Sequence, residues 1–193
     1  MKTLILNGSP RPRGDTAALI GRLTAALPGE CRVVDAYRCG ISPCVDCRYC
    51  RTHPGCAIQD GMQELYRYIE ACDAVVIASP IYFSELTGKL LDLASRLQTY
   101  YSMRYFRQET PPIRAKRGAV ILAGGGDGAP DRALATARVL LRQMNASALC
   151  EPVISHSTNT RPAAEDSQAL AGIARMAAFL RGEPEKQTER ELK

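Results

Sequence analysis

Short apolar runs alternate along this chain with longer segments in which apolar residues recur every three or four positions. Five of the runs predict β-strands, at residues 3–6, 31–36, 74–78, 118–122 and 149–154. The segments with helical spacing predict helices at about 15–27, 61–71, 85–101, 130–144 and 164–181. Because strands and helices alternate, the sequence predicts an α/β fold with a doubly wound, five-stranded parallel sheet and helices on both faces.

The turn between the first strand and the first helix has the composition of a phosphate-binding loop. Gly8 and Gly14 let the main chain approach a ligand, and the start of the helix supplies N–H groups and a positive dipole end. The spacing matches neither the Walker loop nor the dinucleotide fingerprint, which favours a single terminal phosphate. An ordinary strand-to-helix turn is the alternative, and Asp15 or Thr16 is expected to cap the helix. Hydroxyls and charged side chains define the predicted phosphate site, which comprises Ser9, Arg11, Arg13, Asp15 and Thr16.

A phosphate loop after the first strand predicts the strand order 2-1-3-4-5, with the ligand at the switch point between the first and third strands. Such a sheet brings the carboxyl ends of all its strands to one edge, so the loops after the third and fourth strands should also contact the ligand. An aromatic pair there can lie against a planar ring, and a glycine run admits a ring edge. Ordinary core packing is the alternative for Tyr82 and Phe83. The predicted contacts are Pro80, Ile81, Tyr82, Phe83, Gly124, Gly125 and Gly126.

Length and composition suit a single domain, which we predict over residues 1–182 of the 193. Residues 183–193 are charged and almost without large apolar groups, so we expect a flexible tail. No apolar run approaches the length of a membrane span and no signal-peptide pattern precedes the first strand, which predicts a cytoplasmic protein without membrane contact. The formal net charge of +5 suits anionic small molecules and is too small to indicate a nucleic-acid partner.

Four of the eight cysteines lie close together in the sequence, at Cys44, Cys47, Cys50 and Cys56. In a reducing compartment such a cluster indicates metal or redox chemistry rather than a disulfide framework. The spacing of the first three is that of iron-sulfur ligands, and zinc is the competing metal. Structural or redox-active free thiols are the remaining interpretation. We expect His53 to be a loop residue, because four thiolates already complete a tetrahedral shell.

A second unusual segment, residues 98–107, is rich in tyrosine and arginine and should extend the third helix into a long connection. Interleaved aromatic and basic residues can stack on nucleic-acid bases. Long connections in compact domains more often cover an active site or form a subunit contact. We therefore expect a dimer contact here that helps to enclose the ligand.

The sequence resembles the flavodoxin-like NAD(P)H-dependent FMN reductases in all three predicted loops. The first loop carries the resemblance in Gly8-Ser9-Pro10-Arg11 and Gly14-Asp15-Thr16, the second in Pro80-Ile81-Tyr82-Phe83 and Thr87-Gly88-Lys89-Leu90, and the third in its glycine run. In that family the first loop holds the phosphate of FMN. The cysteine motif is similar to that of the iron-sulfur flavoproteins, a branch of the same family in which it ligates a 4Fe-4S cluster beside FMN. Other relatives carry similar cysteines without a cluster.

The resemblance implies an FMN-dependent oxidoreductase that transfers reducing equivalents from NAD(P)H to a second acceptor, such as a flavin, a quinone or another small molecule. The flavin carries out the chemistry, so no catalytic acid or base is expected from the protein. A homodimer or homotetramer is implied as well. One alternative is an electron carrier with FMN and a 4Fe-4S cluster that works with a ferredoxin-like partner. Another is a module that binds flavin or senses thiol redox state without catalysis.

Overall fold

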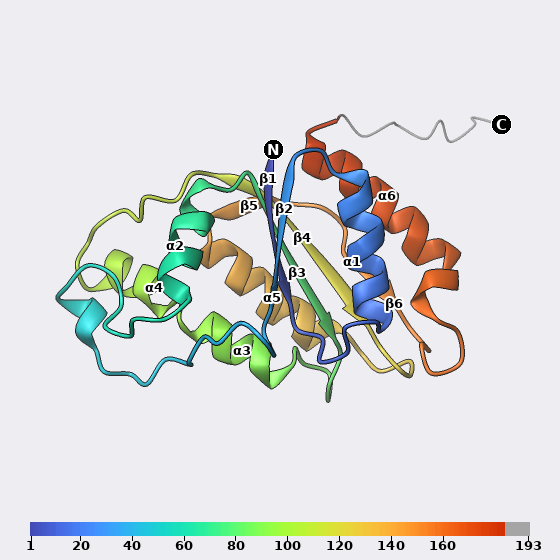
Figure 1. Ribbon diagram of the computed structural model, residues 1–193, viewed down its shortest axis with the longest axis horizontal. Coiled ribbons are helices and arrows are strands. Elements are labelled where there is room, and N and C mark those ends of the chain that lie inside the picture. The colour runs from blue at the N-terminus through green and yellow to red at the C-terminus, as the bar shows by residue number, and fades with distance from the viewer. Residues whose placement is uncertain (184–193) are drawn as a thin grey trace.

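The fold is a parallel sheet covered by helices on both faces, and the computed structural model describes residues 1–183 of it (Figure 1). The hydrogen-bonded strand order is β2-β1-β3-β4-β5, and β6 also pairs with β4, all in parallel register. The predicted α/β class and strand order are therefore confirmed. Apart from Glu183, the predicted tail lies outside the described residues. The strands are β1 (Lys2–Asn7), β2 (Glu30–Asp35), β3 (Ala74–Pro80), β4 (Lys116–Ala123), β5 (Ala146–Leu149) and β6 (Val153–Ser155).

The predicted fifth strand is divided into two short strands, so the described sheet has six strands rather than five. β5 pairs with the first part of β4, and β6 pairs with its last three residues. Pro152 lies in the interruption between them. Proline has no N–H to donate to a sheet, so it favours a break in an edge strand.

The helices form two layers on opposite faces of the sheet (Figure 1). Helices α1 and α6 pack together on one face, and the other α-helices cover the opposite face. None of the helices within residues 1–183 is both long and apolar enough to cross a membrane. The α-helices are α1 (Asp15–Ala26), α2 (Met62–Ala71), α3 (Gly88–Ser95), α4 (Gln98–Tyr105), α5 (Asp131–Gln143) and α6 (Ser167–Arg181), with 3-10 turns at η1 (Tyr49–Arg51) and η2 (Ala163–Glu165).

Alternate residues of the central strands supply the cores on the two faces. In β1, Leu4 and Leu6 pack beneath α2 and its neighbours, whereas Ile5 packs beneath α1 and α6. All three side chains are fully buried. Complete burial of an aliphatic side chain contributes about 1.5–3 kcal/mol. Because both faces are covered, the central strands read as continuous apolar runs, which is the pattern that identified them in the sequence.

The single helix predicted over residues 85–101 is wrong in its extent and continuity. Tyr82 and Glu85 exchange backbone hydrogen bonds across a tight turn, so the helix begins only at α3. It is interrupted before α4, where Arg96 N–H donates to the carbonyl of Leu93 and Leu97 N–H to that of Ala94. These contacts are of the tighter 3-10 type. The interruption coincides with the buried Arg96 side chain, which makes long-range contacts described below.

Asp166 anchors the start of α6 through several hydrogen bonds to its carboxylate. One carboxylate oxygen accepts from the N–H groups of Gln168 and Ala169, both at 3.1 Å. The other accepts from Ser155 Oγ at 2.9 Å and from Arg161 at 2.7 Å. Burial opposes the charge on this carboxyl, but the hydrogen bonds and the Arg161 charge outweigh it and lower the pKa of Asp166.

We expect Asp166→Ala to reduce the free energy of unfolding by roughly 2 kcal/mol at pH 7, since a helix cap and charge-assisted hydrogen bonds are lost. Asp166→Asn should cost less because its side-chain oxygen still accepts from the helix N–H groups. The lowered pKa of Asp166 means that its contribution is present at neutral pH and is lost as the pH falls through the folded-state value, below about pH 4. Urea denaturation at pH 7 and pH 3 measures both effects. If the free energy of unfolding of the wild type exceeded that of Asp166→Ala by the same amount at both pH values, this account would be contradicted.

Candidate functional site

The predicted phosphate loop is held against the ends of β3 and α3. Gly8 N–H donates to the carbonyl of Ala78 at 2.8 Å, and Thr87 Oγ1 donates to the carbonyl of Gly8, also at 2.8 Å. Ser9 is buried, and its N–H donates to Asn7 Oδ1 at 2.9 Å. A Cβ atom on Gly8 would lie 2.8 Å from Thr87 Oγ1 and 2.9 Å from Ser79 Oγ, closer than real Cβ contacts come. Glycine is therefore required at this position by the packing of the loop.

The start of α1 has no side-chain cap, so the expected capping role of Asp15 or Thr16 is wrong. Gly14 occupies the capping position, and it has no side chain to accept from the first N–H groups. The Asp15 carboxylate turns elsewhere: one oxygen accepts from Ala163 N–H at 3.0 Å, and the other lies 3.2 Å from the Arg11 guanidinium. Thr16 is buried in the first turn. The helix start therefore presents backbone donors that no side chain caps, with the Asp15 carboxylate in the first turn directed to Arg11 and Ala163 instead.

The loop after β3 carries an aromatic side chain at the tip of a strained turn. Phe83 and Ser84 both have left-handed backbone conformations, with φ of 52° and 64°. Two consecutive residues of this kind between the paired Tyr82 and Glu85 are typical of a type I′ turn, which glycine or asparagine normally fills. Phe83 is fully exposed and Tyr82 is 45 % exposed, so the alternative that they are core aromatics is wrong. Ile81 N–H donates to the carbonyl of Ala123 at 2.9 Å and ties this loop to the next one.

The glycine loop after β4 is tied to the segment after β6. Gly124 N–H donates to the carbonyl of Ser155 at 2.8 Å, and Asn159 N–H donates to that of Gly125 at 3.2 Å. His156 follows directly, and its Nδ1 atom is buried without a hydrogen-bond partner in the part of the chain that the structure describes. This atom lies 3.7 Å from where a Cβ on Gly124 would be. His156 was not predicted as a site residue, although its position just after the last strand marks the same edge of the sheet.

The structure thus brings the three predicted loops together at the carboxyl edge of the sheet (Figure 1). The first and second loops meet at Gly8 and Thr87, and the second and third meet at Ile81 and Ala123. An uncapped helix start lies at the first loop, and an unpartnered buried nitrogen lies beside the third. This is the arrangement expected for an anionic ligand with a planar polar ring.

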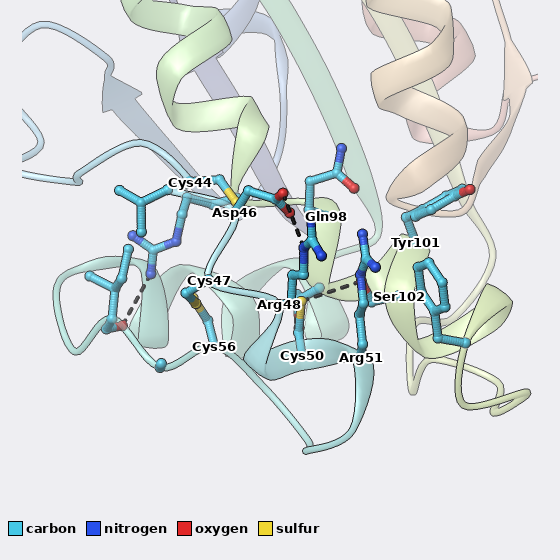
Figure 2. A pocket seen from close by; sticks show the side chains of 16 residues that line it. Cys44, Asp46, Cys47, Arg48, Cys50, Arg51, Cys56, Gln98, Tyr101 and Ser102 are labelled. Carbon is cyan, nitrogen blue, oxygen red and sulfur yellow. Dashed lines mark hydrogen bonds and ion pairs between the residues drawn. The ribbon is translucent and has the colours of Figure 1, made fainter.

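The four clustered cysteines line a single cavity of about 180 Å³ between the long loop that follows β2 and helix α4 (Figure 2). We refer to residues 42–58 as the cysteine loop. Cys47 is exposed, and Cys44, Cys50 and Cys56 are half-buried. Within residues 1–183, His, Cys, Asp and Glu side chains form no group of three or more already gathered to hold a metal ion. The donor set fits a soft metal centre all the same, since four thiols share one cavity and thiolates are the ligands of iron-sulfur clusters.

Hydroxyl groups on one side of the α3–α4 segment bind the cysteine loop. Ser95 Oγ accepts from the N–H of Cys44 at 2.9 Å, and Thr99 Oγ1 donates to the carbonyl of Gly55 at 3.1 Å. The Cys50 thiol donates to Ser102 Oγ at 3.3 Å, as Figure 2 shows. The spacing of three and four residues places these hydroxyls on one side of a helix. That spacing was visible in the sequence, but nothing there indicated what the polar side would face.

The aromatic segment predicted as a subunit contact also lies against the cysteine loop. Tyr101, Ser102 and Phe106 line the cavity together with the cysteines (Figure 2). The Arg51 guanidinium lies 4.4 Å from the centre of the Phe106 ring, within the range of a cation–π contact. The segment therefore has a role within one chain, and its role as a dimer contact stays a prediction.

Arg96 holds both ends of the cysteine loop from the interior of the protein. Its Nη1 donates to the carbonyl of Ser42 at 2.9 Å, and its Nη2 donates to that of Ile58 at 3.1 Å. Nη1 also forms an ion pair with Asp60 at 2.8 Å. Burial opposes ionisation of Asp60, but the hydrogen bonds from Arg96 and from the Ser42 and Met62 N–H groups outweigh it and lower the pKa of this carboxyl. The side chain of Arg96 is 0 % exposed.

Arg107 holds the middle of the same loop. Its Nη1 donates to the carbonyls of Cys50 at 3.0 Å and His53 at 2.8 Å, and Nη2 pairs with Glu109 at 2.6 Å. The His53 ring stacks on Tyr49, with 4.5 Å between the ring centres. These contacts agree with the prediction that His53 is a loop residue. Two arginines that no motif identified thus fix the loop that carries the four thiols.

The model of one known family matches residues 1–160, and its description is NADPH-dependent FMN reductase. The chain belongs to that family. Its fold is similar to that of the NAD(P)H:quinone oxidoreductase from Methanothermobacter marburgensis, with a TM-score of 0.70 at 18% identity over 94% of this chain and 97% of that one. At this identity the likeness concerns the fold.

Curated relatives of this family member are named iron-sulfur flavoproteins. One, from Methanocaldococcus jannaschii, is 28% identical over 99 residues, which are 50% of this chain and 51% of that protein. Another, from Archaeoglobus fulgidus, is 28% identical over 134 residues, which are 68% of this chain and 58% of that protein. The match thus spans between half and three-fifths of the length of these two relatives.

Proposed function

We propose that this family member binds FMN at the carboxyl edge of its sheet and acts as an FMN-dependent oxidoreductase. The observation that carries the proposal is the start of α1, where Gly14 leaves the backbone donors uncapped beside the buried Ser9 and Thr16. A phosphate there would satisfy these donors and the positive end of the helix dipole. The match to the FMN reductase family supports the same ligand.

The side chains around this loop would contribute to phosphate binding in different ways. Ser9 and Thr16 would donate hydroxyl hydrogen bonds, and Arg11 and Arg13 would supply positive charge from the exposed side. Asp15 would act indirectly, because its carboxylate already pairs with Arg11 and binds Ala163 N–H. It orients the arginine and connects the phosphate loop to the segment before α6.

The second and third loops would frame the flavin ring. Pro80, Ile81, Tyr82 and Phe83 would form one wall, and the backbone of Gly124, Gly125 and Gly126 would approach a ring edge, with open space beside Gly126. The buried Nδ1 of His156 lies beside this edge and would find a polar ring atom as its partner. Bound FMN supplies the hydride and one-electron chemistry, so the residues of the chain bind it, orient it and exclude water from it.

We propose NAD(P)H as the electron donor and a small molecule such as a quinone or a flavin as the acceptor, with cytoplasmic location and a homo-oligomeric state expected for the whole protein. The protein loaded with FMN and mixed anaerobically with NADPH or NADH should lose the visible absorbance of oxidised flavin. Addition of a quinone should then restore it. A bound flavin that neither nucleotide reduces, but that dithionite does reduce, would contradict the proposed donor while leaving FMN binding intact.

Thr16→Val combined with Arg11→Gln should weaken FMN binding by about 100-fold or more, because hydrogen bonds to a charged group contribute about 1.5–3 kcal/mol each. Valine keeps the shape of the buried threonine, which limits structural damage. Arg22→Gln removes an exposed positive charge from the same helix and serves as the control. Fluorescence titration of the apoprotein with FMN measures the affinities. Equal affinity of the double variant and the control would place the phosphate elsewhere.

A second candidate function is electron transfer through a 4Fe-4S cluster in the cysteine cavity. The specific observation that favours it is that Cys44, Cys47, Cys50 and Cys56 line one cavity, together with the name shared by the curated relatives. A cluster held by these thiolates would supply one-electron chemistry, and a ferredoxin-like protein would be a suitable partner. Zinc, or free thiols that sense redox state, would use the same residues.

Anaerobic reconstitution with iron and sulfide should yield about four irons per chain and broad visible absorbance. Cys50→Ala should abolish most of this iron, because a ligand is removed. Cys31→Ala removes a half-buried thiol on β2 outside the cysteine loop and should retain full iron content. Iron and sulfide analysis of the purified variants decides the matter. Zinc retained in place of iron, or equal iron loss in both variants, would count against the cluster.

A further inference from the structure

Arg96 lines the cysteine cavity, although it belongs to none of the motifs that the sequence shows. Its side chain is 0 % exposed. A buried guanidinium is found where its charge and its N–H groups are compensated. The contacts of each of its nitrogens therefore indicate what Arg96 does in this cavity.

One donor of Arg96 has no acceptor. The two terminal nitrogens are used, since they bind the carbonyls of Ser42 and Ile58 and the carboxylate of Asp60. The Nε atom is buried and has no hydrogen-bond partner among residues 1–183. Buried N–H groups are almost always paired in native proteins. A donor left open on a residue that lines the cavity indicates an acceptor inside the cavity.

The positive charge of Arg96 lies at the wall of the same cavity as the thiols. Asp60 carries the matching negative charge, but its two oxygens also accept from the N–H groups of Ser42 and Met62, both at 3.0 Å. Burial acts against the positive form of Arg96, yet the hydrogen bond and ion pair with Asp60 outweigh it and raise the pKa of the guanidinium.

The two carbonyls that Arg96 binds lie at equal separations in the sequence from the first and the last of the four clustered cysteines. Ser42 lies two residues before Cys44, and Ile58 lies two residues after Cys56. One side chain therefore fixes the backbone next to the first and the last cysteine. It does so from a buried position.

We propose that Arg96 is a positioning residue for the cysteine site, which fixes the backbone next to Cys44 and Cys56 and donates its Nε–H to a ligand sulfur in the cavity when the four thiolates bind a cluster. This inference rests on the proposed cluster function. An N–H donor and a positive charge beside a ligand sulfur stabilise the reduced, more negative form of an iron-sulfur centre. Arg96 should therefore raise the reduction potential of the centre.

The first test uses the wild-type protein, reconstituted anaerobically, reduced with dithionite and labelled with ¹⁵N at arginine Nε. Pulsed EPR should detect a ¹⁵N nucleus coupled to the reduced centre. A protein that takes up no iron would overturn the cluster proposal and this inference with it. A fully loaded centre without a coupled nitrogen would overturn this inference alone.

The second test compares variants by redox titration followed by EPR and absorbance. Arg96→Lys keeps the charge but removes Nε–H together with the two-pronged binding of the Ser42 and Ile58 carbonyls. It should shift the reduction equilibrium at least tenfold toward the oxidised form, which is about 59 mV for one electron. The ¹⁵N coupling should also vanish. Arg48→Gln is the matched control, because Arg48 lines the same cavity from an exposed position, and it should shift the equilibrium less than threefold.

Asp60→Asn separates positioning from simple structural support. It removes the countercharge and leaves Arg96 with its Nε–H, so the equilibrium should move in the opposite direction, toward the reduced form. Structural damage would move both variants the same way. Shifts of the same sign in Arg96→Lys and Asp60→Asn, or an unchanged potential in Arg96→Lys with full iron content, would overturn the proposal.

Discussion

Parallel pairing of β1 between β2 and β3 is the constraint on which the rest of this structure depends. Because all strands run in the same direction, their carboxyl ends must emerge at one edge, and the loops that follow them must meet there. Hydrogen bonds then fix those loops to one another, with Gly8 bound between Ala78 and Thr87. A binding site at this edge is a consequence of sheet topology, while its preference for an anion comes from the uncapped start of α1.

The cysteine cavity does not depend on sheet topology in this way, since no strand end supplies its residues. It is built where a long loop after β2 lies on the α3–α4 segment, and polar side chains of that segment bind the backbone of the loop. Arg96 and Arg107 bind backbone carbonyls of the loop, so its conformation does not depend on the identity of most of its side chains. Two kinds of interaction thus fix the irregular backbone of the two sites. Backbone hydrogen bonds that continue the sheet hold the loops at its edge, and side-chain donors hold the cysteine loop.

Local patterns were enough to predict the strands, their order and the loops at the sheet edge, because the apolar runs of β1, β3 and β4 are buried on both faces. The interruption of the helix before α4 could not be predicted from the sequence in the same way. Leu90, Leu93 and Leu97 continue the helical pattern through it, and the interruption coincides with contacts between Arg96 and residues more than thirty positions away. Pro152, in contrast, was a visible signal for the division between β5 and β6.

The anchoring of the cysteine loop at Ser42 and Ile58 has a consequence for how this part of the molecule can vary. With both ends fixed to one buried guanidinium, the segment between them is closed off from the sheet, and changes in its length need not be transmitted to β2 or α2. The entropic cost of lengthening a closed loop grows only slowly with its length. Insertions between Ser42 and Ile58 would therefore be confined to the loop, whose second half Arg107 and Thr99 still bind, whereas an exchange at Arg96 would release both ends of the loop together.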